Sequence, residues 1–379
     1  MLNVGKKLEM KIIFSAGGTG GHIFPAIAVA DELKRQMPNA EILFVGALGK
    51  MEMERVPTAG YKIEGLNIAG FQRKLSINNI WNNVKLPFKI LDSMRTVRRI
   101  IKNFKPDVVA GFGGFASGPT LRAAAEMHIP TVLQEQNSYA GVTNKLLAKK
   151  ARLICVAYEG LDKFFPANKI ILTGNPVRAD IINVTAKRKE GIIFFGLDSS
   201  KKTIFVSGGS LGARTLNNCI VQNVDFFKQH TEIQVIWQCG KIYFETLKTC
   251  ESAQLPNVHL LPFVQRMDLA YAVADIVIAR AGALTISELC LVGVPTILIP
   301  SPNVAEDHQT KNATALSKKD AAVLIPDSEA VEKTLPMVLN ILNDSQSAQS
   351  MRYNILKFGK PEAAKDIVKA IISQTDVSR

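Results

Sequence analysis

The sequence predicts an α/β protein built from two similar domains, each with a parallel β-sheet covered by helices. Two glycine-rich turns, one in each half of the chain, carry this prediction. The first turn, Ser15–His22, follows the apolar run Ile12–Phe14, and the second, Ser207–Ala213, follows the run Thr203–Val206. Each turn leads into a helical pattern. The length of 379 residues exceeds the size at which a single core keeps growing. We therefore expect two domains that face each other across a cleft.

Short apolar runs rich in β-branched residues recur in both halves, bounded by turn residues and separated by helical spacing. In the first half these predicted strands are Lys11–Ser15, Glu41–Gly46, Val108–Gly111, Thr131–Gln134 and Leu153–Ala157. In the second half they are Thr203–Val206, Gln234–Gln238, Val258–Leu261, Ile276–Ala279 and Thr296–Pro300. Strands that are apolar throughout, with helices between them, indicate parallel sheets covered on both faces. The boundary between the domains is expected near Gly174–Val177.

The loops that follow the strands are the candidate binding sites, because ligands in such sheets bind beyond the carboxyl ends of the strands. A strand, a glycine turn and a helix start place bare backbone N–H groups and a positive helix end there, which suits a phosphate or another anion. A third glycine-rich turn, Gly111–Pro119, loosely fits the dinucleotide fingerprint, with Glu135 near the place of a ribose-binding acid. The polar stretch Gln134–Asn137 ends the next strand.

In the second half, Arg280–Gly282 form a turn between a strand and a helix. The N–H groups of Ala283–Thr285 at that helix start can hold a diphosphate, and Glu288, about one turn further on, can accept both hydroxyls of a ribose. A carboxylate in a first helical turn is also a simple means of stabilising the helix dipole. At the level of the sequence both explanations of Glu288 stay open.

The net charge of +13 is concentrated in one segment, Phe71–Lys105, where nine lysines and arginines stand against Asp92 alone. This segment also carries bulky apolar residues, and a mixture of the two suits the surface of an anionic bilayer. Nucleic acid is not expected as a partner, because no recognition motif accompanies the charge. An ordinary amphipathic helix with its cations in water is the alternative. The candidate membrane-binding residues are Leu75, Ile80, Trp81, Lys85, Phe88 and Lys89.

Composition limits the classes of protein to which this chain can belong. No apolar stretch reaches membrane-spanning length without interruption. The five cysteines are odd in number and never spaced C-x-x-C, so we expect buried thiols in a reducing cytoplasm, with neither a zinc site nor a disulfide framework. The nine residues before Met10 are expected to be an extension that precedes the first strand.

Six motifs follow one another in an order that resembles a known family. They are Gly17–His22, Gly113–Ser117, Glu135–Asn137, Gly174–Arg178, Gly208–Ala213 and Gly282–Glu288. The chain resembles the MurG-type N-acetylglucosaminyltransferases of bacterial peptidoglycan synthesis from about Met10 to its last helix. The resemblance implies the GT-B glycosyltransferase fold, in which two Rossmann-like parallel-sheet domains face a cleft.

This resemblance also implies an activity and its partners. The activity is transfer of GlcNAc from UDP-GlcNAc to the 4-hydroxyl of the MurNAc unit of lipid I, giving lipid II with inversion at the anomeric carbon. The implied partners are UDP-GlcNAc, lipid I and an anionic membrane surface, with other proteins of cell-wall synthesis as an open option, and no cofactor. The implied place is the cytoplasmic face of the plasma (inner) membrane, where the protein is peripheral.

Domain roles and residue roles follow from the same resemblance. Residues 10–176 would form the acceptor and membrane-binding domain, residues 177–351 the UDP-GlcNAc-binding domain, and a last helix from about residue 352 to 379 would fold back onto the first domain. The residues implied in donor binding are Thr19, Gly20, Gly21, Asn137, Arg178, Ser210, Val264, Ala283, Leu284, Thr285, Ile286, Ser287, Glu288, His308 and Gln309. Val264 would offer its backbone to uracil and Glu288 would take the ribose hydroxyls. His22 and Glu135 are the implied catalytic residues and would face the acceptor.

The chemistry requires a base for the acceptor hydroxyl and neutralisation of the departing diphosphate. His22 on its glycine turn is the candidate base, and a helix-start histidine bonded to backbone is the alternative. The chain carries no Asp-x-Asp at a strand end, so helix-start amides and Arg178 are expected to neutralise the diphosphate without an obligatory metal. Gln134 stands where some family members have a histidine, which weakens an acid or base role at that position.

Two other functions remain alternatives. Gly208–Gly212 satisfies the G-x-S-x-G pattern of a serine hydrolase, with Ser210 as nucleophile. A nucleophile elbow leaves the Gly17–His22 turn and the Glu288 loop unexplained. A sugar-nucleotide sensor on the membrane would bind UDP-GlcNAc without turnover.

Overall fold

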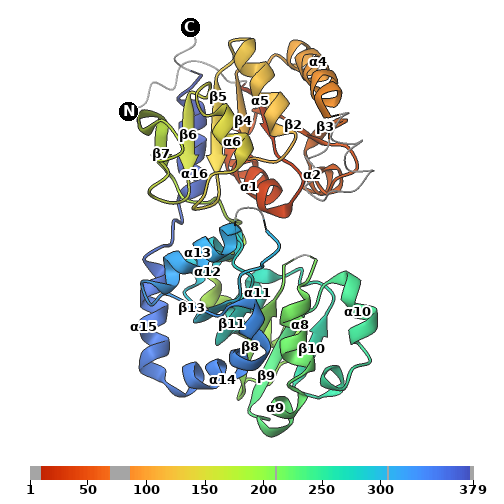
Figure 1. Cartoon of the computed structure of the whole chain (residues 1–379), viewed down its shortest axis with the longest axis vertical. Coiled ribbons are helices and arrows are strands. Elements are labelled where there is room, and N and C mark those ends of the chain that lie inside the picture. Colours follow the sequence, from red (N-terminus) through yellow and green to blue (C-terminus); the bar gives the residue numbers. More distant parts are fainter. Residues whose placement is uncertain (1–9, 69–85, 210, 305–306, 376–379) are drawn as a thin grey trace. The chain divides into compact units, whose positions relative to one another are not determined.

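The computed structural model describes residues 10–68, 86–209, 211–304 and 307–375, and for residues 86–88 the backbone alone (Figure 1). The described chain forms two compact units. The first contains the chain up to Val177 and again from Glu362, and the second contains Arg178–Pro361. The division lies beside the expected boundary at Gly174–Val177 because the chain passes there from the last strand of one sheet to the first helices of the next.

The first unit is a seven-stranded parallel sheet with the order β3-β2-β1-β4-β5-β6-β7. Its strands are β1 (Lys11–Ser15), β2 (Glu41–Ala47), β3 (Lys62–Leu66), β4 (Val108–Gly111), β5 (Thr131–Glu135), β6 (Leu153–Val156) and β7 (Ile170–Leu172). Its helices are α1 (Gly20–Gln36), α2 (Glu52–Thr58), α4 (Leu86–Phe104), α5 (Ser117–Glu126), α6 (Val142–Leu147) and α16 (Ala363–Ile372).

Helices cover both faces of this sheet. Neighbouring residues of one strand point to opposite faces, so each residue is buried on one side or the other. Ile12 and Phe14 of β1 pack with helices α1 and α16 on one face, whereas Ile13 packs with α4, α5 and α6 on the other. The strands therefore carry apolar residues at consecutive positions, as expected for a parallel sheet with helices on both sides.

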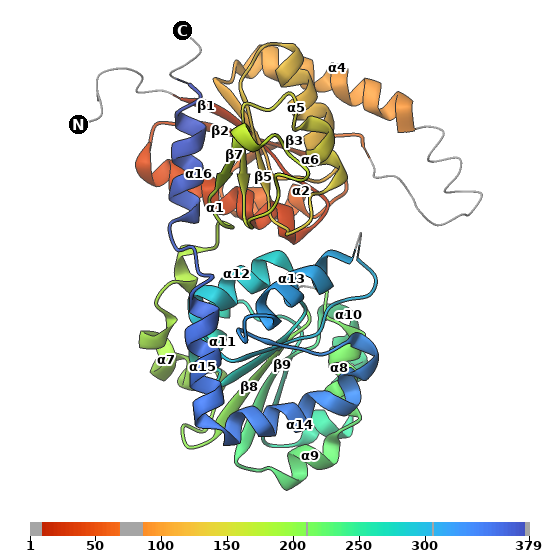
Figure 2. The same cartoon turned by 60° about the vertical axis from the view of Figure 1, so that its left-hand side comes forward.

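The second unit repeats this plan with a six-stranded parallel sheet of order β10-β9-β8-β11-β12-β13. Figure 2 shows β8 and β9 of this sheet among the helices of the unit. Its strands are β8 (Lys202–Ser207), β9 (Ile233–Gln238), β10 (Val258–Leu261), β11 (Ile276–Ala279), β12 (Thr296–Leu298) and β13 (Val323–Leu324). Its α-helices are α7 (Arg188–Phe195), α8 (Arg214–Val221), α9 (Val224–Gln229), α10 (Lys241–Leu247), α11 (Met267–Val273), α12 (Ala283–Val292), α13 (His308–Ser317), α14 (Ala330–Asn343) and α15 (Ser345–Leu356).

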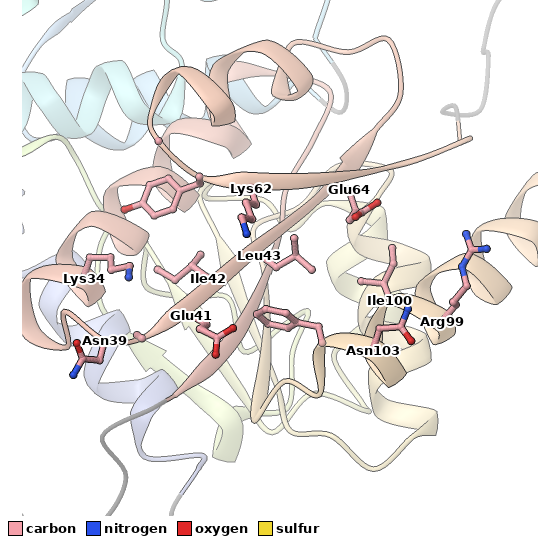
Figure 3. A pocket seen from close by; sticks show the side chains of 14 residues that line it. Lys34, Asn39, Glu41, Ile42, Leu43, Lys62, Glu64, Arg99, Ile100 and Asn103 are labelled. Atoms are coloured by element: carbon pink, nitrogen blue, oxygen red, sulfur yellow. The ribbon is translucent and has the colours of Figure 1, made fainter.

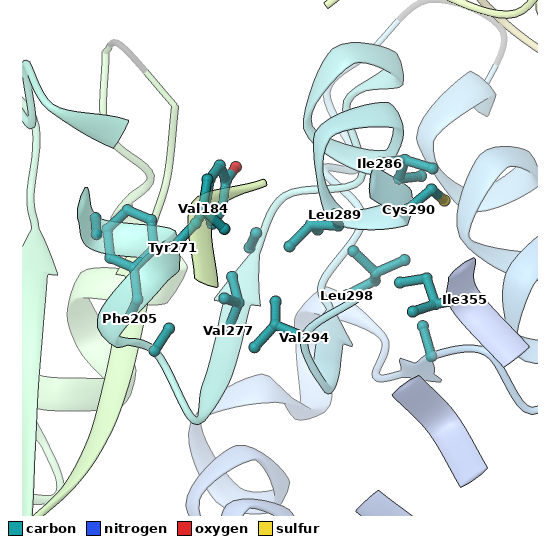
Figure 4. Close-up of a cluster of buried hydrophobic side chains, with 14 of the residues drawn as sticks. Val184, Phe205, Tyr271, Val277, Ile286, Leu289, Cys290, Val294, Leu298 and Ile355 are labelled. Carbon is teal, nitrogen blue, oxygen red and sulfur yellow. The ribbon is translucent and has the colours of Figure 1, made fainter. Parts of the chain in front are cut away.

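One apolar cluster of this unit ties the sheet to helices α11 and α12 (Figure 4). Phe205 of β8 and Tyr271 of α11 meet edge to face with ring centroids 5.7 Å apart. Ile286 and Leu289 of α12 are buried in the same cluster. The core thus anchors the two helices that carry polar groups of the candidate site described below.

The predicted α/β class of two parallel-sheet units is confirmed, and the ten predicted strands are present to within two residues at each end. Strands β3, β7 and β13 were not predicted. All three lie at sheet edges, and β7 has only three residues, Ile170–Leu172. Lys62 and Glu64 interrupt β3, and β13 has two residues.

The return of the chain to the first unit begins later than expected. Helix α15, which contains residue 352, belongs to the second unit, where Met351 and Ile355 are buried in its two apolar clusters. The first unit resumes at Glu362, and Ile367, Val368 and Ile371 of α16 are buried in the apolar cluster where α16 packs against α1 and β6. The expected start at about residue 352 is therefore wrong by about ten residues, because apolar side chains hold α15 on α12 and α14.

Four of the five cysteines are buried and Cys250 is half-buried, and all five are free thiols. Burial raises the pKa of the Cys155 and Cys290 thiols to about 12. No helix in the part of the chain that the structure describes is long and apolar enough to cross a membrane.

Candidate active site

The glycine turns of the first unit meet at the point where the strand order reverses. There β1 pairs with β4 in parallel, so the turn after β1 and the turn after β4 leave the sheet side by side. Phe112 N–H donates to Ser15 O at 2.8 Å, and Ser117 Oγ donates to the same oxygen at 2.8 Å. Gly114 has φ +86°, and a Cβ on it would overlap the backbone of Gly17. The two turns can pack this closely because Gly114 has no Cβ.

A buried carboxylate that the sequence did not single out holds this turn. Glu52, at the start of α2, is completely buried. Its Oε2 accepts from Gly18 N–H at 3.0 Å and its Oε1 accepts from Ala47 N–H at 2.9 Å. A Cβ on Gly17 would lie 2.5 Å from Oε1. The Gly18 N–H is thus committed to an internal anion, whereas the sequence had predicted it to be bare.

His22 lies in the first turn of α1, against the turn after β4. A Cβ on Gly113 would lie 2.9 Å from the Nδ1 and Cε1 atoms of the imidazole, so this glycine makes room for the ring. The Nδ1 atom of His22 is 3.1 Å from Oε1 of Gln136. Thr19, the exposed residue before α1, accepts from His22 N–H at 3.1 Å through its carbonyl oxygen, with Gly20 and Gly21 between them.

Glu135 ends β5 and is buried among four N–H donors. Its Oε1 accepts from the backbone and side chain of Asn137 at 3.1 and 3.3 Å. Its Oε2 accepts from Gly141 N–H and from Asn144 Nδ2, both at 2.9 Å. The carboxylate therefore shapes the loop that follows β5, and its lone pairs are largely occupied by that loop.

In the second unit β8 pairs with β11, so the same reversal of strand order places two further turns side by side. Helix α12 starts after Gly282, and its first intrahelical bond is donated by Ile286 N–H to Gly282 O. The earlier N–H groups of a helix have no intrahelical partner, which leaves those of Ala283, Leu284 and Thr285 pointing out of the helix start. The Ala283 side chain is buried, so this residue can contact a ligand only through its backbone. The Ile286 side chain is also buried, and its N–H already donates to Gly282 O.

Glu288 lies in the second turn of α12, not in the first, so the dipole explanation of this carboxylate is not supported. Its Oε2 accepts from the Tyr271 hydroxyl at 2.9 Å, and its Oε1 lies 3.7 Å from Nη2 of Arg178. Burial raises the pKa of Glu288, while Arg178 and the Tyr271 hydroxyl act in the opposite direction. The side chain is 15% exposed, so the carboxylate is largely buried yet reachable at one side.

Gln238 connects two loops of the same unit. Its Nε2 donates to Gly209 O at 2.8 Å, and its Oε1 accepts from Val264 N–H at 2.9 Å. Since the N–H of Val264 is engaged inside the protein, its carbonyl oxygen is the backbone group that it can offer to a nucleobase. Ser210 lies outside the described residues.

Gln309 and His308 begin α13, and the Gln309 Oε1 accepts from Ser301 N–H at 2.8 Å. Ser287 donates through its hydroxyl to Ala283 O at 2.9 Å.

In the described residues no group of three or more histidine, cysteine, aspartate and glutamate side chains lies together in a way that could hold a metal ion. Of the candidate membrane-binding residues, Leu75, Ile80, Trp81 and Lys85 lie outside the described residues, as does the Phe88 side chain, and Lys89 is half-buried on α4.

Both units match a single family of known proteins. Residues 12–156 match the glycosyltransferase family 28 N-terminal domain, and residues 203–369 match the glycosyltransferase family 28 C-terminal domain. The chain belongs to glycosyltransferase family 28. The family assignment covers both pairs of glycine turns, and it gives no support to the serine hydrolase alternative.

Two relatives of this family 28 chain carry the same name. A protein of Flavobacterium psychrophilum is 54% identical over 96% of this chain and 97% of its own length, and one of Bacteroides fragilis is 52% identical over 97% and 96%. Both are named UDP-N-acetylglucosamine–N-acetylmuramyl-(pentapeptide) pyrophosphoryl-undecaprenol N-acetylglucosamine transferase. The crystal structure of Acinetobacter baumannii MurG is 30% identical, covers 96% of this chain and 99% of its own, and superimposes with a TM-score of 0.73.

A cavity of about 710 Å³ in the first unit lies elsewhere, at the amino-terminal ends of β2 and β3 (Figure 3). Lys34, Lys62 and Arg99 line it together with Glu41 and Glu64, so its charges are mixed. In a family 28 chain the sites expected from the sheet topology are at the carboxyl ends of the strands, and this cavity opens at the opposite ends. It is therefore not part of the candidate active site.

Replacing Glu52 tests whether the carboxylate holds the glycine turn. In Glu52→Gln an amide NH₂ faces one of the two N–H donors, and we expect a loss of about 1–3 kcal/mol in the free energy of unfolding. Urea unfolding of the full chain, followed through the transition of the first unit, measures this loss. Glu54→Gln, an exposed change on the same helix, is the matched control and should stay within about 0.5 kcal/mol of wild type. Equal unfolding midpoints for the two variants would contradict the role of Glu52.

Proposed function

We propose that this chain transfers GlcNAc from UDP-GlcNAc to the 4-hydroxyl of MurNAc in lipid I and so forms lipid II, with inversion at the anomeric carbon. The observation that carries the proposal is similarity over nearly the whole chain, at 54% and 52% identity, to relatives named for this transfer. The two pairs of glycine turns, one in each unit, supply sites of the kind that such a reaction needs.

The second unit is proposed to bind the donor. The outward N–H groups at the start of α12 and the Arg178 guanidinium would neutralise the diphosphate as it leaves. Glu288 would accept the ribose hydroxyls, and the Val264 carbonyl would accept from the uracil N–H. The remaining proposed donor contacts are Ser210, Leu284, Ile286, Ser287, His308 and Gln309 in this unit, with Thr19, Gly20, Gly21 and Asn137 from the first unit.

The first unit is proposed to act on the acceptor. His22 would take the proton of the 4-hydroxyl while the oxygen attacks the anomeric carbon and the bond to UDP breaks. Glu135 is the weaker base candidate, because four N–H donors already hold its carboxylate. We assign it the task of shaping the loop that follows β5.

We further propose that the protein is peripheral on the cytoplasmic leaflet and docks through the segment Phe71–Lys105. The described part of this segment supports docking. Met94, Val97 and Ile101 of α4 are buried in the core, while Leu91 is 57% exposed and Ile90 and Arg95 are exposed beside it. An apolar pair flanked by cations on a helix whose other face is anchored suits an anionic membrane surface.

The reaction and its base are tested together by mass spectrometry of lipid I incubated with UDP-GlcNAc and the protein. Wild type should convert lipid I into a product heavier by one GlcNAc residue. His22→Ala should lower turnover by roughly 10²–10⁴-fold, the usual contribution of a general base, and leave UDP affinity nearly unchanged. His230→Ala, in the second unit, is the control. UDP-GlcNAc binding without turnover by wild type would favour a sensor, and near-normal turnover by His22→Ala would remove its role as the base.

Glu288→Gln tests the ribose assignment. The variant keeps an acceptor for Tyr271 but loses the charge, so UDP should bind about 1.5–3 kcal/mol more weakly, or roughly tenfold to a hundredfold. Because burial raises the pKa of Glu288, the wild-type carboxylate gains its proton at a higher pH than an ordinary glutamate. The difference in affinity between wild type and Glu288→Gln should therefore shrink as the pH falls. Calorimetric titration with UDP measures both effects, with exposed Glu332→Gln as control, and equal affinities at neutral pH would refute the assignment.

Charge reversal on α4 tests membrane docking. Each cation near an anionic surface contributes about 1 kcal/mol, so Lys89→Glu with Arg95→Glu should weaken binding to anionic vesicles by roughly thirtyfold or more. UDP affinity should not change. Lys318→Glu with Lys319→Glu makes the same change in net charge on exposed residues of the second unit. Vesicle co-sedimentation distinguishes the pairs, and equal loss in both would mean that net charge, not this helix, governs binding.

A further inference from the structure

A chain of buried amides leads to the imidazole of His22. Asn175, Gln134 and Gln136 are 3%, 1% and 1% exposed. Gln134 Nε2 donates to Asn175 Oδ1 at 3.0 Å, and Asn175 Nδ2 donates to the backbone oxygen of Gln136 at 2.9 Å. Gln136 Nε2 donates to Gln134 Oε1 and, at 2.8 Å, to Phe112 O. The last member, Gln136 Oε1, faces His22 Nδ1 at 3.1 Å.

The direction of the Gln136 amide follows from its partners. The backbone oxygen of Phe112 can only accept, so the NH₂ end of the Gln136 amide must face it. The reverse orientation would set the amide oxygen against the Phe112 carbonyl oxygen and against Gln134 Oε1, and it would leave two acceptors without a donor. Hence it is Oε1 that faces His22. An amide oxygen cannot donate, so the His22 Nδ1 must carry the proton.

A neutral imidazole has a single N–H group, and its other nitrogen holds the lone pair. We propose that Gln136 is a positioning residue that holds neutral His22 in the tautomer protonated on Nδ1, which makes Nε2 the atom that accepts the proton of the acceptor hydroxyl. This inference rests on the proposed role of His22 as the base. In the transfer step the hydroxyl proton passes to Nε2, the oxygen bonds to the anomeric carbon, and the bond to UDP breaks with its electron pair going to the diphosphate. The resulting imidazolium keeps its Nδ1–H on Gln136.

The rest of the amide chain makes this orientation rigid. Gln136 cannot rotate without breaking its bond to Phe112 O, and Gln134 is held in turn by Asn175. A neutral amide also favours the imidazolium less than a carboxylate in the same place would. The ring can therefore be held in one tautomer without being held in its protonated form.

The charged groups on the elements next to α1 are held by partners other than the Gln136 side chain. Glu52, on α2, is bound to Gly18 N–H and Ala47 N–H, and Glu135, on the β5 loop, is bound by its own loop. Lys365 of α16, which packs along α1, acts on Glu32 near the other end of α1. A change in the tautomer of His22 on substitution of Gln136 therefore reports the lost hydrogen bond.

The test is nitrogen NMR of the full chain labelled with ¹⁵N-histidine, at about pH 8, above the ordinary histidine pKa of about 6.5. The His22 signals are those absent from His22→Ala. Wild type should show the Nδ1–H pattern, and Gln136→Leu should move His22 toward Nε2–H and lower kcat by roughly tenfold or more, within the roughly 10²–10⁴-fold reach of a general base. The KM for UDP-GlcNAc should not change. Gln349→Leu, an exposed change on α15, is the matched control.

The wild-type spectrum by itself can overturn the proposal, even if Gln136→Leu does not fold. An Nε2–H pattern for His22 in wild type would overturn the proposal, and so would an Nδ1–H pattern that persists in folded Gln136→Leu. A wild-type Nδ1–H pattern lost in Gln136→Leu would support it. Failure of the proposed function gives a different result, namely full turnover by His22→Ala with the Nδ1–H tautomer intact in wild type.

Discussion

The parallel pairing of the first strand of each unit with a strand far along the chain is the constraint on which the sites depend. β1 pairs with β4, and β8 pairs with β11, so the strand order reverses at these pairs and the helices on either side diverge. The turns that follow the paired strands are left side by side at the carboxyl ends. In the first unit they touch so closely that a Cβ on Gly114 would overlap the backbone of Gly17. Every candidate catalytic or diphosphate-binding group sits on one of these turns or beside it.

The buried carboxylates of the two units differ in what surrounds them. This difference distinguishes carboxylates that hold the backbone in place from a carboxylate that can bind a ligand. Glu52 accepts from the N–H groups of Gly18 and Ala47, and Glu135 accepts from donors of its own loop, so both charges hold neighbouring segments in place. Glu288 has a tyrosine hydroxyl on one oxygen and Arg178 at 3.7 Å from the other. A carboxylate with few hydrogen-bond donors around it can still accept a hydrogen bond from a ligand. We therefore assign ligand binding to Glu288 and a structural role to Glu52 and Glu135.

The segment between the units contributes to both candidate sites. Asn175 bonds to Gln134 and Gln136 in the first unit, and Arg178, three residues on, lies beside Glu288 in the second. The motif Gly174–Arg178 therefore does more than join the units. Its first half supports the amides that orient His22, and its last residue faces the carboxylate proposed to bind the ribose.

The sequence by itself determined the fold class, the nine interior strands with the edge strand β10, and the glycine turns, because these depend on local patterns of apolar residues and on glycine where backbones meet. It also pointed to His22, Glu135 and Glu288 as groups on loops that follow strands. It did not predict the edge strands β3, β7 and β13, which are short or carry charged residues, or the late return of the chain at Glu362. Only the tertiary structure showed that Glu52, Gln136 and Tyr271 act on the site residues, since each contact joins elements at least 17 residues apart in the chain. A hydrogen bond between distant segments has no local pattern, so the partner of a site residue is decided by the packing of the sheet.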